Sequence, residues 1–270
     1  MSEHSTISWT HSSWNPVTGC TKVSSGCAHC YAERFAERWR GVPAHPYEQG
    51  FDLKLWPERL DLPLRWRVPR MIFVNSMSDL FHEDVPPEYV QRVFATMNRA
   101  RRHTFQVLTK RAARLADLAS SLEWSPNIWI GVTVESNDTA GRVDYLDRVP
   151  AAVKFVSAEP LLGALENLDV TLIDWLIVGG ESGPERRPMR SEWVTSLRDR
   201  CVIAGVPFYF KQWGGFRPSS APPALDGVVW REMPAAAIGR TEDSCRGERS
   251  RFCARPSRPE QPIALPLLQA

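Results

Sequence analysis

The stretch "NIWIGVTVES" at residues 127–136 has an almost continuously apolar core that ends in polar residues. Such a run is typical of a strand that is covered on both faces, as in a parallel sheet. Comparable runs recur five times along the chain, at residues 70–79, 103–111, 152–160, 173–183 and 206–215. Helical patterns lie between them, at residues 86–100, 111–122, 137–149 and 191–205. The alternation predicts right-handed βαβ units and a parallel sheet.

A further strand is expected to lead into a cysteine-rich stretch near the start of the chain. The sequence therefore predicts an α/β fold, a partial (β/α) barrel of about six parallel strands plus this leading one. We expect the barrel to span residues 1–216, with a loop and a short C-terminal extension at 217–236. Residues 237–270 are rich in Arg and Pro and lack any period, which predicts a disordered tail.

The composition limits the class of protein. The 270 residues are 43% hydrophobic and 24% charged, as in soluble globular proteins. No apolar run reaches the roughly 18 residues of a membrane span, and the start lacks the features of a secretory signal. We therefore expect a cytoplasmic protein without a membrane partner. A net charge of +2 gives no footprint for non-specific DNA binding.

Three cysteines with the spacing C-x6-C-x2-C lie in the stretch 19–30, "GCTKVSSGCAHC". In a reducing compartment, clustered cysteines indicate metal or redox chemistry. Cys20, Cys27 and Cys30 are suited to three irons of a [4Fe–4S] cluster whose fourth iron stays open for a ligand. A structural zinc completed by His29 or His11 fits the spacing equally well. Three cysteines at the mouth of a barrel favour the cluster.

Polar residues follow each predicted strand, and ligands of parallel α/β folds bind at the carboxyl ends of the strands. Four charged residues at these ends are candidates for catalysis, through substrate binding or proton transfer: Lys110, Glu159, Glu181 and Lys211. Salt bridges among the four are an equally good interpretation. A metal-independent hydrolase that uses Glu135, Glu159 and Glu181 is a further hypothesis. Away from this rim, we expect a buried Cys201 and a surface-exposed His103.

Seven motifs together resemble the radical S-adenosylmethionine (SAM) enzymes. They are "WNPVTGCTKVSSGCAHCYAE", "NSMSDLFH", "LTKR", "GVTVES", "SAEPL", "VGGESG" and "FKQWGG". More closely, the set resembles a phage-related family of uncharacterised function that is usually placed near the spore photoproduct lyase branch. The resemblance covers residues 7–234. The common superfamily spacing is C-x3-C-x2-C, so this chain has a longer first gap.

The resemblance implies a cluster on Cys20, Cys27 and Cys30 and reductive cleavage of SAM to a 5′-deoxyadenosyl radical. An electron donor such as a flavodoxin or ferredoxin is implied, and the unknown substrate includes nucleic acid or a nucleobase among its candidates. The implied SAM contacts are His29 near the adenine, Ser76, Ser78 and Asp79 at the methionine amino group, Glu135 at the ribose, and Gly179 and Gly180 as close backbone approaches to the adenine. A zinc-stabilised binding protein without catalysis is the alternative.

Overall fold

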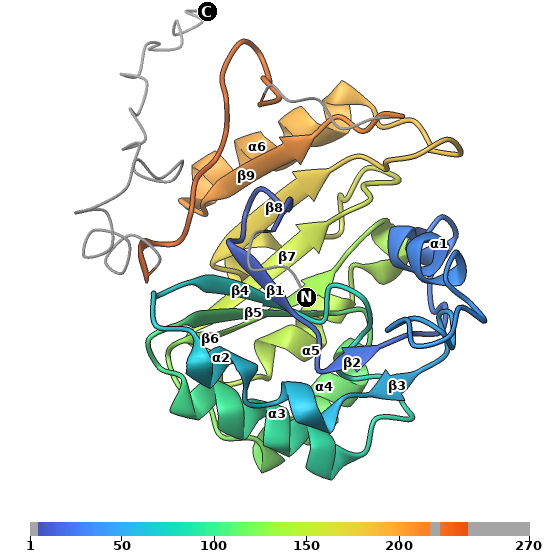
Figure 1. Cartoon of the computed structure of the whole chain (residues 1–270). Coiled ribbons are helices and arrows are strands. Elements are labelled where there is room, and N and C mark those ends of the chain that lie inside the picture. Colours follow the sequence, from blue (N-terminus) through green and yellow to red (C-terminus); the bar gives the residue numbers. More distant parts are fainter. Residues whose placement is uncertain (1–4, 217–221, 237–270) are drawn as a thin grey trace, which may run out of the picture.

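The computed structural model describes residues 5–216 and 222–236. Over these residues the main sheet has seven parallel strands in the order β1-β4-β5-β6-β7-β8-β9, and it curls into a half-barrel (Figure 1). The strands are β1 (Ser12–Trp14), β4 (Met71–Val74), β5 (Thr104–Thr109), β6 (Ile128–Thr133), β7 (Val153–Ala158), β8 (Trp175–Gly179) and β9 (Phe208–Gln212). Each predicted run contains its strand, and the expected leading strand forms one edge. The predicted α/β partial barrel is confirmed at this level.

Helices follow the strands as the sequence predicts, and α3, α4 and α5 cover one face of the sheet (Figure 1). They are α1 (Tyr31–Glu37), α2 (Leu62–Arg65), α3 (Pro87–Arg99), α4 (Ala112–Leu118), α5 (Arg142–Asp147) and α6 (Ser191–Ala204). Gly205 ends α6 in the left-handed conformation, with φ of 69°. A small antiparallel pair, β2 (Val17–Thr18) and β3 (Lys54–Leu55), flanks the main sheet.

The two faces of the sheet are packed by different clusters. The helix-covered face is mainly aliphatic. The opposite, inner face carries a mainly aromatic cluster that includes Trp9, Phe73, Trp129, Phe155, Trp175 and Tyr209. A side chain on Gly131 would lie 2.4 Å from the Phe155 ring, so the glycine makes room for this packing. Trp129, Trp175 and Tyr209 lie near the starts of their strands, so the aromatic cluster fills the inner side below the carboxyl ends.

The predicted C-terminal extension covers an edge of the sheet. The backbone of Phe210 donates to Trp230, at 2.9 Å, and that of Glu232 donates to Phe208, at 3.1 Å. This pairing protects β9, the last strand of the sheet. The predicted tail at 237–270 lies outside the described residues. Within the described part of the chain, no helix is both long enough and apolar enough to cross a membrane.

Two predictions for single residues had opposite outcomes. Cys201 is fully buried in the core beneath α6, as its apolar neighbours predict. His103 is also fully buried, so the expectation of a surface residue is wrong. Its Nε2 lies 3.0 Å from the carbonyl of Pro63, which belongs to the short helix α2. The segment that contains Pro63 and Trp66 packs over His103 and buries it.

Candidate functional site

The cysteine loop, residues 19–30, lies at the carboxyl ends of the parallel strands (Figure 1). It starts directly after β2 and leads into α1. At its start, Gly19 forms a parallel bridge with Ser78, which follows β4. Cys20, Cys27 and Cys30 are half-buried and carry free thiols. The loop therefore presents three reduced sulfurs at the mouth of the half-barrel.

Arg111 attaches the start of the loop to the end of β5. Its side chain is 7% exposed, and its guanidinium donates to Cys20 Sγ at 3.4 Å. It also donates to Thr21 Oγ1 at 2.8 Å and to Glu83 Oε2 at 2.7 Å, and contacts Asp79 Oδ2 at 3.3 Å. A buried arginine with this many partners has little freedom to move. Arg111 thus fixes Cys20 from outside the loop.

His82 supports the same part of the loop. Its Nδ1 accepts the backbone N–H of Asp84 at 3.1 Å, so in the neutral ring the proton belongs on Nε2. Nε2 lies 2.9 Å from Thr21 Oγ1 and donates to it. Burial, followed by the charge of Arg111, lowers the pKa of His82 and keeps the ring neutral. We call Cys20, Thr21, Asp79, His82, Glu83 and Arg111 the arginine hub.

Asp79, expected at the methionine amino group, is occupied by internal donors. Its carboxylate accepts the Thr109 hydroxyl at 2.7 Å and the backbone N–H groups of Phe81 and Lys110, each at 3.0 Å. Asp79 therefore orders the turn after β4. Of the two serines expected beside it, Ser76 donates to Asn15 Oδ1 at 3.2 Å. Ser78 donates to the carbonyl of Val17 at 2.8 Å.

Glu135 is the second anchor of the loop, and its side chain is fully buried. Oε1 accepts Ser24 Oγ at 2.7 Å and pairs with Lys110 Nζ at 3.0 Å, while Oε2 pairs with Arg142 at 2.8 Å. Burial disfavours the carboxylate, but Lys110 and Arg142 outweigh it and lower the pKa of Glu135. A side chain on Gly26 would lie 2.4 Å from Oε1, so the loop backbone packs directly on this carboxylate. Glu135, which is expected at the ribose, also holds the loop.

Glu181 is the third anchor. One of its oxygens lies 3.2 Å from His29 Nδ1, and the other accepts the guanidinium of Arg187 at 2.6 Å. Burial opposes ionisation, but hydrogen bonds from the side chain and backbone of Arg187, and from His29, hold the pKa of Glu181 at about 2. His29, expected near the adenine, is thus tied to the end of β8.

The fourth charged group at the rim is the pair formed by Glu159 and Lys211. Lys211 Nζ lies 2.6 Å from Glu159 Oε1, and their side chains are 24% and 14% exposed. Glu159 Oε2 accepts Ser157 Oγ at 3.1 Å and Trp9 Nε1 at 3.3 Å. Of the four predicted catalytic residues, these two pair with each other, whereas Lys110 pairs with Glu135 and Glu181 with Arg187.

The two glycines after β8 leave room for protein atoms. A side chain on Gly179 would lie 2.8 Å from Glu159 Oε1, and one on Gly180 would lie 2.2 Å from the carbonyl of Trp213. At Gly180, the position that a side chain would take is filled by the chain that follows β9. The glycines therefore bring the ends of β7, β8 and β9 close together.

Burial acts on two of the three thiols in the same direction. Burial, followed by the charge of Asp79, raises the pKa of Cys20 to about 11, and Arg111 opposes this shift. Burial also raises the pKa of Cys30, against the backbone N–H groups of Glu33 and Ala32 at the start of α1. Cys27 acts electrostatically on both of these thiols. Within the described residues, no three His, Cys, Asp or Glu side chains are grouped as ligands of one metal ion.

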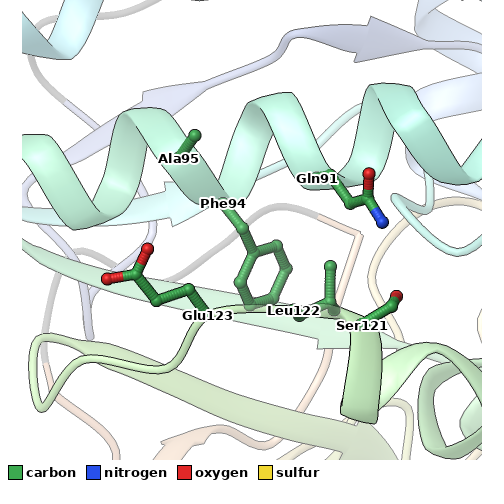
Figure 2. Close-up of a pocket in the computed structure, with 6 residues that line it drawn as sticks. All are labelled: Gln91, Phe94, Ala95, Ser121, Leu122 and Glu123. Carbon is green, nitrogen blue, oxygen red and sulfur yellow. The ribbon is translucent and has the colours of Figure 1, made fainter.

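A pocket of about 300 Å³ lies on the helical layer, and its lining residues are drawn in Figure 2. It is lined by residues of α3 and of the segment that leads into β6, namely Gln91, Phe94, Ala95, Ser121, Leu122 and Glu123. Because α3 packs on the helix-covered face, this pocket is separate from the mouth that holds the cysteine loop (Figure 1).

Sequence reasoning missed most of the residues that hold the loop in place. They are Ser24, Gly26, Arg111, Arg142 and Arg187. One signal was available for Arg111, because it directly follows Lys110 in the "LTKR" strand end. Arg142 and Arg187 lie several residues beyond their strand ends, where the sequence shows only ordinary solvated charges.

Comparisons with known proteins add one finding. The family model described as "Protein of unknown function (DUF5131)" matches residues 4–239, which include all of the site residues named above. No curated protein and no solved structure matched the chain.

Proposed function

Taking as the premise that the chain belongs to the DUF5131 family of proteins of unknown function, we propose that it is a radical SAM enzyme. Cys20, Cys27 and Cys30 would hold a [4Fe–4S] cluster. The observation that supports this most is the position of three free thiols on one loop across the carboxyl ends of a curled parallel sheet. The bound cofactors would supply reductive cleavage of SAM, which generates a 5′-deoxyadenosyl radical for hydrogen abstraction.

The donor set suits this cofactor. Three sulfurs from one loop, with no fourth cysteine in residues 19–30, match a cluster that keeps one iron open. Ligands of a cubane bind different irons, so they are spaced more widely than the ligands of one ion. The absence of a single-ion ligand group within the described residues is compatible with that spacing. We also propose that the half-barrel is of the radical-SAM type.

The chain's own residues would position the cysteine loop, shield the site from water and exchange protons. The arginine hub, Glu135 and Glu181 orient the loop. The aromatic cluster on the inner face keeps water from reaching the site from below. Glu159 and Lys211 are partly exposed at the mouth, and a carboxylate with an ammonium group 2.6 Å away is suited to bind a polar substrate or transfer a proton at Glu159 Oε1.

Ser76 and His29 remain our candidates for direct SAM contact, because both are half-buried, His29 within the loop and Ser76 in the segment that follows β4. A flavodoxin or ferredoxin would supply the electron. We place the enzyme in the cytoplasm, where thiols stay reduced. The resemblance to the lyase branch makes a nucleobase the first substrate class to test.

Anaerobic reconstitution with iron and sulfide, followed by SAM and dithionite, tests the proposal. We expect a brown protein whose broad visible absorbance is bleached by dithionite, and formation of 5′-deoxyadenosine without added substrate. Cys27→Ala should lose the colour and the product. Cys201→Ala, which removes a buried thiol in α6, is the matched control and should keep both. A colourless protein with stoichiometric zinc would instead establish the zinc-stabilised binding protein.

A further inference from the structure

Arg111 is set apart from the other charged residues at the mouth by its direct contact with a cysteine sulfur. Its terminal nitrogen lies 3.4 Å from Cys20 Sγ, within the range of a hydrogen bond to sulfur. The guanidinium is nearly buried, at 7% exposure, so solvent screens its charge only weakly. The side chain comes from the turn between β5 and α4, which is separate from the loop that supplies the cysteines.

The arginine hub keeps this contact in one geometry. Nη1 of the guanidinium donates a hydrogen bond to Asp79, Nε donates to Glu83, and Nη2 donates to the Thr21 hydroxyl. Thr21 is held in turn by His82. Asp79 is fixed by Thr109 and the backbone of Lys110, so the guanidinium cannot turn away from Cys20 without breaking several charge-assisted hydrogen bonds.

We propose that Arg111 is a positioning residue that orients Cys20 and tunes the reduction potential of the metal centre. This inference rests on the proposed function, since it requires an iron–sulfur cluster on the loop. Hydrogen bonds to cluster sulfurs and nearby positive charge both stabilise the reduced, more negative state and raise the potential. Arg111 supplies both through one side chain. Its contact is with the ligand sulfur, so we do not assign it a catalytic role.

A redox titration followed by electron paramagnetic resonance tests this inference. Arg111→Gln removes the charge and the hydrogen bond to Cys20. We expect the reconstituted variant to show a lower midpoint potential, by about a tenfold change in the reduction equilibrium, or about 59 mV for one electron. Arg111→Lys keeps a charge but loses the fork of donors, so it should shift in the same direction by less.

Lys22→Gln is the matched control. Lys22 lies on the same loop, but it is 53% exposed and pairs with Glu33. Its charge is screened, so its removal should leave the potential near that of the wild-type protein. Iron and sulfide content and thermal melting are measured for each variant. If Arg111→Gln does not fold, the lysine variant provides the test.

The outcomes separate the two proposals. A wild-type protein that takes up no cluster under reconstitution contradicts the proposed function and this inference with it. A wild-type protein with a cluster, whose potential is unchanged in both arginine variants, contradicts only the role of Arg111. A shift as large in Lys22→Gln as in Arg111→Gln would also overturn it, because the effect would then belong to overall charge.

Discussion

Two lysine–glutamate pairs lie at the mouth of the half-barrel, and they differ in what surrounds them. Glu135 is fully buried, and besides Lys110 it binds Arg142 and Ser24 of the cysteine loop. Glu159 is 14% exposed, and besides Lys211 it binds Ser157 and Trp9. The two lysines are exposed to a similar degree, 21% and 24%. The same pair of residue types therefore occurs in two very different environments.

The difference indicates two roles. A buried carboxylate that pairs with a cation at each oxygen joins the loop to the ends of β5 and β6. A partly exposed pair is bound more weakly by its surroundings, because water competes for both partners. The first pair is therefore structural, and we propose the second for ligand contact. The following predictions test this division, beginning with the largest effect.

Removal of the buried carboxylate should have the largest effect. Glu135→Ala leaves Lys110 and Arg142 without their shared partner, and uncompensated buried charge costs about 3–5 kcal/mol. Urea unfolding should show this loss, while Glu159→Ala should lose only about 1 kcal/mol because its site admits water. Equal losses in the two variants would contradict the division into a structural and an accessible pair.

The contact between the loop and the buried pair can be tested at Gly26. An added methyl group would lie 2.4 Å from Glu135 Oε1, so Gly26→Ala should destabilise the protein by about 1–3 kcal/mol. Gly163→Ala is the control, since a side chain there meets nothing within 4 Å. Urea unfolding gives the stability, and limited proteolysis reports the loop. If Gly26→Ala melts like Gly163→Ala, the loop does not rest on Glu135.

Glu181 is a third rim carboxylate, and it resembles the buried pair in holding the loop. Its pKa of about 2 is below its ordinary value of 4.5, so its ionised form stabilises the protein above about pH 4.5. This contribution is lost as the pH falls toward 2. Arg187→Met should raise the pKa of Glu181 and cost roughly 1 to 2 kcal/mol at neutral pH.

The pH dependence distinguishes charge from packing at this position. The difference in unfolding free energy between wild type and Arg187→Met should shrink as the pH falls from about 4.5 toward 2, because Glu181 takes up a proton first in the unfolded chains and in the variant, and in the folded wild type only near pH 2. Urea titrations at a series of pH values measure it. A difference that stays constant down to about pH 2.5 would mean that Arg187 acts through its packing alone.

The fold was largely predictable because its signals are local. Each strand is a short apolar run covered on both faces, and each run ends where the chain reaches the polar mouth. The handedness of βα connections then limits the topology to a curled parallel sheet. His103 was misplaced because its burial depends on the segment around Pro63, which packs over it from 40 positions away in the chain.

The charged residues at the site could be predicted from the sequence, but the partners of each residue could not. Residues such as Lys110, Glu135 and Glu159 could be identified as rim residues because they follow strands. Their partners depend on which strand ends are adjacent and on the path of the cysteine loop, and neither is encoded locally. A glycine such as Gly26 gives no signal in the sequence that its missing side chain leaves room for a carboxylate 109 positions away.

The smallest effect on stability is expected at the exposed pair. Lys211→Met should change the unfolding free energy by less than about 1 kcal/mol, because Glu159 keeps its bonds to Ser157 and Trp9 and is reached by water. Lys110→Met should cost more, since Glu135 has no access to solvent. If Lys211 is free of a structural duty, its variant should retain the iron and sulfide of the wild-type protein and still form 5′-deoxyadenosine from SAM alone, yet fail to modify a substrate. If the Lys211→Met protein loses its cluster, the Glu159–Lys211 pair also holds the loop in place. The division into a structural pair and an accessible pair would then be wrong.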